Sequence, residues 1–405
     1  MPLIIYVLGF GTFAQGTSEF MLSGLLPSLA GDLDRSLSEA GLLVSAFAIG
    51  MVVGAPLLTL ATLRLPRRAA LIGFQAVFAA GHVAAALVPH FGFLLVMRVV
   101  TGMAYAGFWT LASVAAVSLV ATDRRGKAMS VVVSGLSLAM ILGVPAGTLL
   151  AQHANWQAAF GAVAVTTALS AVAVFFTLPT GHDTTTARPT PRKELCSLAV
   201  PRLWVAYATT ALTTSATIAV FSYLGALLQD VTGVTEGLVP LVLGLYGVGA
   251  LTGLTIGGRI ADQAPFGALL NGMATVAVVA AGISAAAHAP MVVILLTVLL
   301  AAGGFLTNPA VNARVFGILG ETRTLGSAMN IAAFNVGIAV APWMSGLVID
   351  AGPGLAGIGW VGAAFALAAM ASTLLDRGLT RRHRHATPAS AVTEVPEPEY
   401  VSTLR

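Results

Sequence analysis

The stretch AGLLVSAFAIGMVVGAPLLTLATL (residues 40–63) contains no charged side chain, and the basic run RLPRR (residues 64–68) follows it directly. Because a helix of about 20 apolar residues spans the hydrocarbon core of a bilayer, this stretch predicts a transmembrane helix. The whole chain of 405 residues is 57% hydrophobic and only 9% charged, with a mean hydropathy of +0.90. Soluble globular proteins carry about 25% charged residues, so the composition excludes a water-soluble fold.

Similar charge-free windows recur along the chain. Eight windows each suit one helix: residues 1–18, 40–63, 69–97, 99–122, 203–229, 237–258, 324–349 and 351–375. Two longer windows, residues 128–182 and 263–313, are each divided by a polar or proline-marked break, at residues 152–157 and 288–290. Eight single windows and two double windows give 12 helices. Since the windows show no period-two alternation, which a membrane β-barrel requires, the predicted fold class is an all-α membrane protein.

The charged residues between the windows predict the orientation. With both termini in the cytoplasm, Arg35 is the only basic residue outside, and Arg98 lies within the membrane. This distribution follows the positive-inside rule, and it accounts for the net charge of +4 and the pI near 9.6 without a nucleic-acid partner. We therefore expect a multi-pass protein of the cell membrane.

The longest polar segment between predicted helices divides the chain into two halves. It covers residues 179–202, so the six-helix halves are residues 1–178 and 203–376, and a polar tail, expected to be disordered, covers residues 377–405. A faint internal repeat supports this division, since GKAM from Gly126 matches GSAM from Gly326. Two related halves place a substrate site between them, near the middle of the membrane.

Two charges interrupt the apolar windows, Glu19 in the first and Arg98 near the start of the fourth. Ionisable residues at membrane depth are costly and are functional candidates by default. A carboxyl group there can take up a proton from one side and release it to the other, although a static hydrogen-bonded acid is the alternative. Arg98 keeps its charge and either pairs with Glu19 or anchors its helix near the outer surface. We expect both residues to take part in proton coupling.

Other polar, aromatic and glycine positions complete the candidate site. Aromatic residues and buried amides are expected to line a substrate cavity, or else to pack and to bond across helices: Tyr105, Phe108, Trp109, Asn308, Asn330 and Asn335. A proline with glycines suggests a hinge in the fifth helix, with tight helix packing as the alternative: Gly135, Gly143, Pro145 and Gly147. Short charged loops suggest a cytoplasmic latch or plain topology signals: Arg64, Arg67, Arg68, Arg259 and Asp262.

Several functional classes lack their characteristic residues. The single cysteine, Cys196, cannot form a disulfide framework or a cysteine-based metal site. His82 has no metal partner at ligand spacing, so we expect a buried, hydrogen-bonded histidine. No GxxxxGK[ST] loop is present, which argues against an ATP-driven pump, and no cluster of catalytic groups suggests an enzyme. We therefore expect a transporter without cofactor, metal site or catalytic residues.

These motifs resemble the major facilitator superfamily, in particular its twelve-span drug:proton antiporter branch. The run from Gly126 to Gly147 is similar to the antiporter motif of the fifth helix, and Arg98-x-x-x-Gly102 is similar to the fourth-helix motif. GTSEFMLSGLLPSLAGDL (residues 16–33), followed by SAFAIGMVVGAP (residues 45–56), resembles bacterial chloramphenicol-efflux transporters. The family links the fourth-helix arginine to proton coupling.

The sequence also departs from this family. Its loop between the second and third helices usually reads GxxxDRxGRR, whereas this chain has Thr59 and Leu63 where the glycine and aspartate stand. Chloramphenicol exporters tend to carry asparagine where Tyr105 stands, and NIAAFNVGIA (residues 330–339) is more similar to sugar and nucleoside exporters.

The resemblance implies proton-coupled efflux of a small drug-like molecule by alternating access, with chloramphenicol or a related antibiotic as the first candidate substrate. Export of sugars, nucleosides or purine-like metabolites is the alternative. The expected partners are the substrate, protons and the bilayer, and the expected state is a monomer that confers antibiotic resistance.

Overall fold

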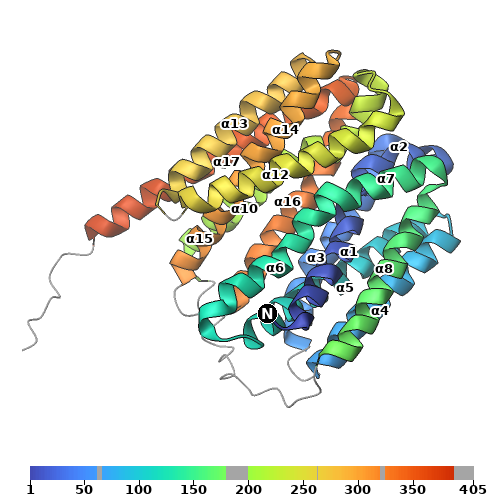
Figure 1. Ribbon diagram of the computed structural model, residues 1–405. Helices are drawn as coiled ribbons and strands as arrows, with labels where there is room; N and C mark the ends of the chain where they lie inside the picture. The colour runs from blue at the N-terminus through green and yellow to red at the C-terminus, as the bar shows by residue number, and fades with distance from the viewer. Residues whose placement is uncertain (62–65, 179–198, 262, 320–323, 387–405) are drawn as a thin grey trace, which may run out of the picture.

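The computed structural model describes residues 1–61, 66–178, 199–261, 263–319 and 324–386, and every regular element among them is helical (Figure 1). The first part of the chain forms the N-terminal bundle. Its helices are α1 (Leu3–Phe20), α2 (Leu22–Asp32), α3 (Leu37–Ala61), α4 (Arg67–Leu87), α5 (Phe91–Ser118), α6 (Arg125–Leu138), α7 (Val144–His153) and α8 (Trp156–Thr177).

The second part of the chain forms the C-terminal bundle. Its longer helices are α10 (Pro201–Phe221), α12 (Val239–Ala261), α13 (Pro265–Ala285), α14 (Pro290–Leu306), α15 (Asn308–Leu319), α16 (Thr324–Asp350) and α17 (Ile358–Ala386). A short helix, α11 (Leu224–Ala226), and the π turn η4 (Leu227–Val231) extend α10. Three of these helices, α10, α13 and α14, begin at proline, whose missing N–H and fixed φ suit the first helical position.

The number of membrane spans agrees with the sequence prediction. Eleven spans among the described residues are long and apolar enough to cross a membrane. The pair α1 and α2, which carries the polar residues Gln15 and Glu19, adds the first span and brings the total to 12. The predicted breaks also hold, since α7 ends at His153 before α8 and α13 ends at Ala285 before α14.

Several spans are interrupted in ways that the sequence windows do not reveal. The first span is broken at Met21, and the tenth is broken at Thr307, whose hydroxyl donates to the carbonyl of Gly304 at 2.7 Å. The fifth span contains a π turn, η3 (Ala139–Gly143), which ends two residues before Pro145. Because proline cannot donate a backbone hydrogen bond, a wider turn ahead of it accommodates the interrupted ladder.

We call the end of the molecule where α8 ends and α10 begins the linker end. The two bundles touch near the opposite end. At the touching end the Ser38 hydroxyl donates to Asp350 at 2.9 Å, and the Gln152 amide donates to the carbonyl of Glu236 at 2.9 Å. The ribbons of the two bundles diverge toward the linker end, where α6 and α15 lie (Figure 1). These contacts between the bundles thus lie away from the linker end.

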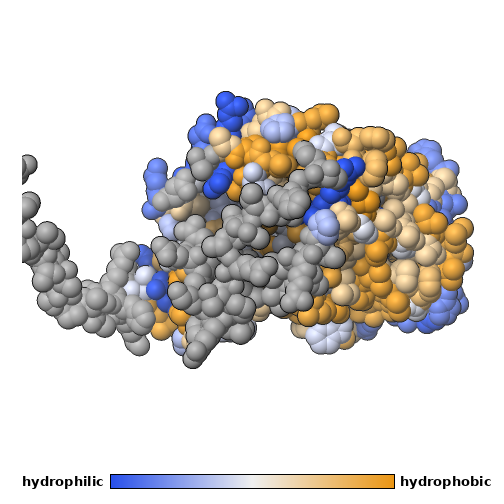
Figure 2. All heavy atoms as spheres, turned by 90° about the horizontal axis from the view of Figure 1, so that it is seen from below, coloured by the Kyte–Doolittle hydropathy of each residue, from blue (hydrophilic) through white to orange (hydrophobic). Residues whose placement is uncertain are grey.

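The flanks of the molecule carry apolar side chains. Phe176, Val278 and Met291 are 79%, 73% and 80% exposed, although each is an apolar residue in or next to a predicted span. Seen from the linker end, apolar side chains extend over the outer flank of the molecule (Figure 2). A surface of this kind is expected to lie against lipid.

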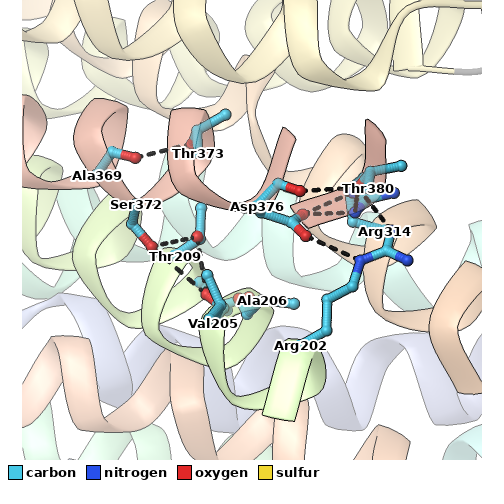
Figure 3. Close-up of polar contacts among 11 residues, drawn as sticks. Arg202, Val205, Ala206, Thr209, Arg314, Ala369, Ser372, Thr373, Asp376 and Thr380 are labelled. Atoms are coloured by element: carbon cyan, nitrogen blue, oxygen red, sulfur yellow. Dashed lines mark hydrogen bonds and ion pairs between the residues drawn. The ribbon is translucent and has the colours of Figure 1, made fainter. Parts of the chain in front are cut away.

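An ion cluster joins three helices of the C-terminal bundle at the linker end. Asp376 of α17 is buried and accepts hydrogen bonds from Arg202 of α10 at 3.2 Å and from Arg314 of α15 at 2.5 Å (Figure 3). Both arginines also donate to the Thr380 hydroxyl, and the Arg314 guanidinium lies 4.3 Å from the ring centroid of Phe266. One carboxylate therefore fixes the linker ends of α10, α15 and α17 to one another.

The last helix extends further than the sequence predicts. α17 continues to Ala386, so the segment expected to be disordered from residue 377 begins as a helix. Once a helix is formed, each further residue adds a hydrogen bond at little cost, and the next proline is Pro388. The remaining tail and most of the 179–202 linker lie outside the described residues.

Candidate transport site

Glu19 lies at the end of α1, on the boundary between the two bundles. It is buried, with 8% of its surface exposed, and it lines a small cavity with Ser23 of α2 and with Ile218, Phe221 and Ser222 around the end of α10. The cavity has room for about one water molecule. A carboxyl group of the N-terminal bundle therefore faces the C-terminal bundle across a small, mostly apolar cavity.

Aromatic rings border this cavity. The rings of Phe20 and Phe221, from opposite bundles, meet edge to face with centroids 6.1 Å apart, and Tyr246 of α12 stacks on Phe221 at 4.3 Å. Apolar rings on both sides lower the local polarity around Glu19. In such surroundings the neutral form of a carboxyl group is favoured over the charged form.

Arg98 of α5 is fully surrounded by protein, with 2% of its surface exposed. Its Nε donates to the carbonyl of Leu43 at 3.1 Å, and one terminal nitrogen donates to the hydroxyl and the carbonyl of Ser18, at 2.9 and 3.3 Å. Its guanidinium also lies 4.2 Å from the ring centroid of Phe47. Among the contacts of the described residues, no hydrogen bond or ion pair joins Arg98 to Glu19, the residue next to Ser18. Backbone carbonyls and a hydroxyl hold the cation instead.

Ser18 also contacts His82 of α4. The Ser18 hydroxyl lies 2.6 Å from His82 Nε2, and His82 Nδ1 lies 2.9 Å from the carbonyl of Phe78. The imidazole stacks on the Phe78 ring with centroids 4.4 Å apart. His82 is thus buried and hydrogen-bonded, as the sequence predicts. No feature of the sequence indicates that its partner is the residue beside Glu19.

The expected aromatic wall is divided between the core and the boundary. Tyr105 and Phe108 are 2% and 0% exposed and pack inside the N-terminal bundle, where Tyr105 lies beside Phe47. Phe108 fills the space beside Gly11 and Tyr105 lies close to Gly16, which agrees with the alternative that these rings pack. Trp109 is only partly buried and is the one of the three with surface outside the core.

The predicted amides connect helices of the C-terminal bundle. Asn330 of α16 accepts a hydrogen bond from Thr210 of α10 and donates to Asn312 of α15, both at 2.9 Å. This is the alternative of bonding across helices. Asn335 is buried and its side-chain oxygen has no hydrogen-bond partner among the described residues, whereas Asn308, which begins α15, is only partly buried.

The glycines of the fifth span face the first span. A side chain at Gly135 would meet the backbone of Gly9, and one at Gly143 would meet Thr17, so both positions require close helix approach. Gly147 likewise faces Met21, while Pro145 lies across the bundle boundary from Gly244 of α12. The segment therefore packs tightly against the first span and also contains a π turn.

Two residues of the predicted latch, Arg67 and Arg68, make contacts within the N-terminal bundle. Arg67 donates to the Ser118 hydroxyl at 2.9 Å, and Arg68 donates to the carbonyl of Phe175 and stacks on its ring. Arg259 is exposed, and Arg64 and Asp262 lie outside the described residues. Arg67 and Arg68 thus tie α4 to α5 and α8.

Sequence reasoning missed two groups of residues. Ser23 and Ser222 border the Glu19 cavity, but hydroxyl residues are too common in this chain to stand out. Asp376 with Arg202 and Arg314 could have been found, because these charges stand at the edges of apolar windows that end on the same predicted membrane face.

Comparison with known proteins agrees with this fold. A family model for the Major Facilitator Superfamily matches residues 8–342. The chain belongs to the major facilitator superfamily. It is therefore a multi-pass membrane transporter rather than an enzyme, and the resemblance noted from the motifs is confirmed.

Two relatives show how this member of the superfamily compares with others. The chain is 36% identical over 362 residues to a chloramphenicol resistance protein of Streptomyces lividans and, to the same extent, to the inner membrane transport protein YdhP of Escherichia coli (strain K12). Each alignment covers 89% of this chain and 92% of the relative. The relatives of this chain therefore include a bacterial inner-membrane transport protein.

Solved structures of the superfamily have the same fold. A mutant of the nucleoside transporter NupG superimposes with a TM-score of 0.74 at 14% identity, covering 92% of this chain and 99% of that one. A bacterial homologue of the human lysosomal transporter Spinster, in an inward-facing and occupied conformation, gives a TM-score of 0.70 at 14% identity, covering 95% and 96%. At these identities the likeness concerns the fold alone.

Proposed function

We propose that this transporter exports chloramphenicol or a related small antibiotic in exchange for protons. The observation that carries the proposal is the position of Glu19, a buried carboxyl group that faces the other bundle across a small cavity. A carboxyl group at a moving boundary meets different surroundings in each conformation, so its proton affinity is coupled to that movement. The similarity to a chloramphenicol resistance protein supports the substrate class.

Both termini are on the cytoplasmic side in this proposal, as the distribution of basic residues predicts. The end at which the bundles diverge then faces the cytoplasm, and the Ser38–Asp350 contact closes the outer end. Substrate enters between the bundles from the cytoplasm, the bundles rock, and the outer end opens. Protonation of Glu19 neutralises the boundary and allows the empty carrier to return.

The proton gradient is sufficient for such export. One proton that crosses about 100 mV gains roughly 2.3 kcal/mol, and a pH difference of about one unit adds roughly 1.4 kcal/mol. Since about 1.4 kcal/mol corresponds to a tenfold concentration ratio, one proton per neutral substrate sustains a gradient of a few hundredfold. Antibiotic resistance without ATP is therefore energetically reasonable.

A drug-susceptibility panel on a sensitive bacterial host, led by chloramphenicol, tests the proposal. Expression of the wild-type chain is expected to raise the inhibitory concentration, and a protonophore is expected to abolish energy-dependent efflux. Glu19→Gln is expected to lose efflux while the protein still reaches the membrane. Asp123→Asn is the control, because Asp123 lies exposed between α5 and α6, away from the cavity and from the contacts between the bundles.

The outcomes separate the alternatives. Full efflux by Glu19→Gln would refute the role of this carboxyl group. If phenicol susceptibility is unchanged and the cells accumulate less of a sugar or nucleoside, the substrate is that sugar or nucleoside rather than an antibiotic. If efflux only equalises the substrate concentrations on the two sides of the membrane and a protonophore does not change it, the pathway is passive.

A further inference from the structure

The hydrogen bonds around Ser18 have a defined direction. A backbone carbonyl can only accept, so His82 Nδ1, which faces the carbonyl of Phe78, carries the proton. In the neutral imidazole Nε2 is then an acceptor, and it takes the hydrogen of the Ser18 hydroxyl at 2.6 Å. This leaves the lone pairs of the same hydroxyl for the Arg98 guanidinium at 2.9 Å. The chain of donors runs from Arg98 to Ser18, to His82, to Phe78.

His82 is 1% exposed, and no carboxylate contacts its imidazole among the described residues. From α5, Arg98 donates to Ser18 and the Tyr105 ring lies 6.3 Å from the Phe78 ring, and on α1 Glu19 follows Ser18. The helix α8 contributes the Phe160 ring at 5.3 Å and contains no charged residue. On α3 the only charged residue is Glu39, at the exposed start of the helix. A protonated His82 would be a second buried cation beside Arg98, and it would cost free energy because no carboxylate in the described structure contacts the imidazole.

Arg98 has an unused donor. Its second terminal nitrogen is buried and has no hydrogen-bond partner among the described residues. A buried donor of this kind costs free energy, and a carboxylate would satisfy it. Glu19 follows Ser18 directly, and Ser18 accepts two hydrogen bonds from the other terminal nitrogen of Arg98. The cation is therefore held near the carboxyl group but on other partners.

We propose that His82 is a positioning residue which, through the Ser18 hydroxyl, holds Arg98 on backbone carbonyls and keeps it from forming an ion pair with Glu19. This inference rests on the proposed function of Glu19 as the proton carrier. When His82 no longer accepts the hydrogen of the Ser18 hydroxyl, the hydroxyl rotates to donate that hydrogen elsewhere. Its lone pairs then no longer point at Arg98, and the guanidinium turns toward Glu19. An ion pair with Arg98 stabilises the charged form of Glu19. Glu19 therefore binds its proton only at a lower pH.

Substrate-induced proton release from the purified protein in detergent, measured against pH with chloramphenicol as the probe, tests this inference. His82→Leu removes the acceptor, and we expect the midpoint of proton release to move lower by about one pH unit, a tenfold change in proton concentration. His82→Gln is the matched control, because its side-chain oxygen can stand where Nε2 stands and accept from Ser18. We expect its midpoint to equal that of the wild type.

Ser18→Ala breaks the chain of donors at its centre and should shift the midpoint in the same direction as His82→Leu. It serves as the second variant if His82→Leu fails to fold. Ser18→Thr retains the hydroxyl and is expected to retain the wild-type midpoint. A purely structural role of His82 would lower the amount of folded protein but would leave the midpoint unchanged.

The outcomes distinguish this inference from the proposed function. If the wild-type protein releases no proton on binding substrate at any pH, the proposed function fails and the inference fails with it. If the wild type shows a midpoint that Glu19→Gln abolishes, but His82→Leu and Ser18→Ala leave it unchanged, the inference alone is overturned. Equal shifts in His82→Leu and His82→Gln also overturn it.

Discussion

The Arg98 guanidinium donates to Ser18, the residue directly before Glu19, at 2.9 Å from its hydroxyl and 3.3 Å from its carbonyl. The two charges that stand out in the apolar windows thus lie close together without forming a hydrogen bond or ion pair in the described structure. Arg98 connects α5 to α1 and, through Leu43, to α3. It holds three spans together at the site where the carboxyl group is located.

Arg98→Lys is expected to be destabilising although it keeps the charge. The planar fork of arginine bonds to two helices at once and stacks on Phe47, whereas a lysine ammonium is a compact point charge. Two hydrogen bonds from a charged donor are worth about 3 to 6 kcal/mol together. Thermal unfolding of the purified protein in detergent measures the loss. A transition temperature equal to that of the wild type would contradict this account of Arg98.

Joining Ser38 to Asp350 should stop transport. The two side chains meet at 2.9 Å and belong to different bundles, so a covalent link would keep this end closed. The variant with Ser38→Cys, Asp350→Cys and Cys196→Ser should lose efflux after treatment with a short bifunctional thiol cross-linker. The pair without reagent, and each single cysteine with reagent, serve as controls. Unimpaired efflux after complete cross-linking would show that this end does not open during transport.

Gly102→Ala should weaken the packing of α5 on α3. A methyl group at Gly102 would overlap the carbonyl oxygen of Phe47, which is backbone and cannot turn aside. The helices would have to separate, so we expect a lower unfolding temperature and less protein in the membrane. Gly73→Ala is the matched control, since a methyl group there meets nothing within 4 Å and alanine favours the helix by about 1 kcal/mol. Equal effects of the two substitutions would contradict the close approach.

Asp376→Asn should destabilise the C-terminal bundle. The side chain of Asp376 is 5% exposed and neutralises two arginines, so its loss leaves two partly buried cations without a carboxylate. Removing one partner of a buried ion pair costs about 3 to 5 kcal/mol, and partial exposure of the arginines places the expected loss at the lower end. Asp123→Asn is the control, because Asp123 pairs with Arg124 at an exposed position. A stability unchanged in Asp376→Asn would show that the cluster does not hold the three helices together.

The spans could be predicted from the sequence because a span depends on a local property. A window such as residues 40–63 must be apolar over its whole length to lie in hydrocarbon, and α3 covers nearly all of it. Breaks at Met21 and Thr307 were not predictable in the same way. Glu19 lies two residues before Met21 and Pro309 lies two residues after Thr307. Neither window has a long polar run, however, and the position of each break depends on how neighbouring helices pack.

The candidate site was predicted in part. Glu19 and Arg98 were recognised because a charge in an apolar window is conspicuous in one dimension. The partners of Arg98, which are the carbonyl of Leu43 and the hydroxyl of Ser18, could not be recognised, since every residue has a carbonyl and serine is common. Whether Tyr105 and Phe108 line a cavity or pack in the core was left open for a similar reason. An aromatic residue in a span can face a cavity, a neighbouring helix or lipid, and only its rotation about the helix axis decides.

The sequence by itself determined that the chain crosses a membrane many times, that it belongs with the major facilitator transporters, and which two charges lie among apolar residues. These follow from the cost of placing charge in hydrocarbon, which depends on residue type and position along a helix. Only the tertiary structure decided that Glu19 faces the opposite bundle and that Arg98 is held by Ser18 and Leu43. Such contacts depend on the rotation and depth of separate helices, which are set by packing between segments far apart in the sequence.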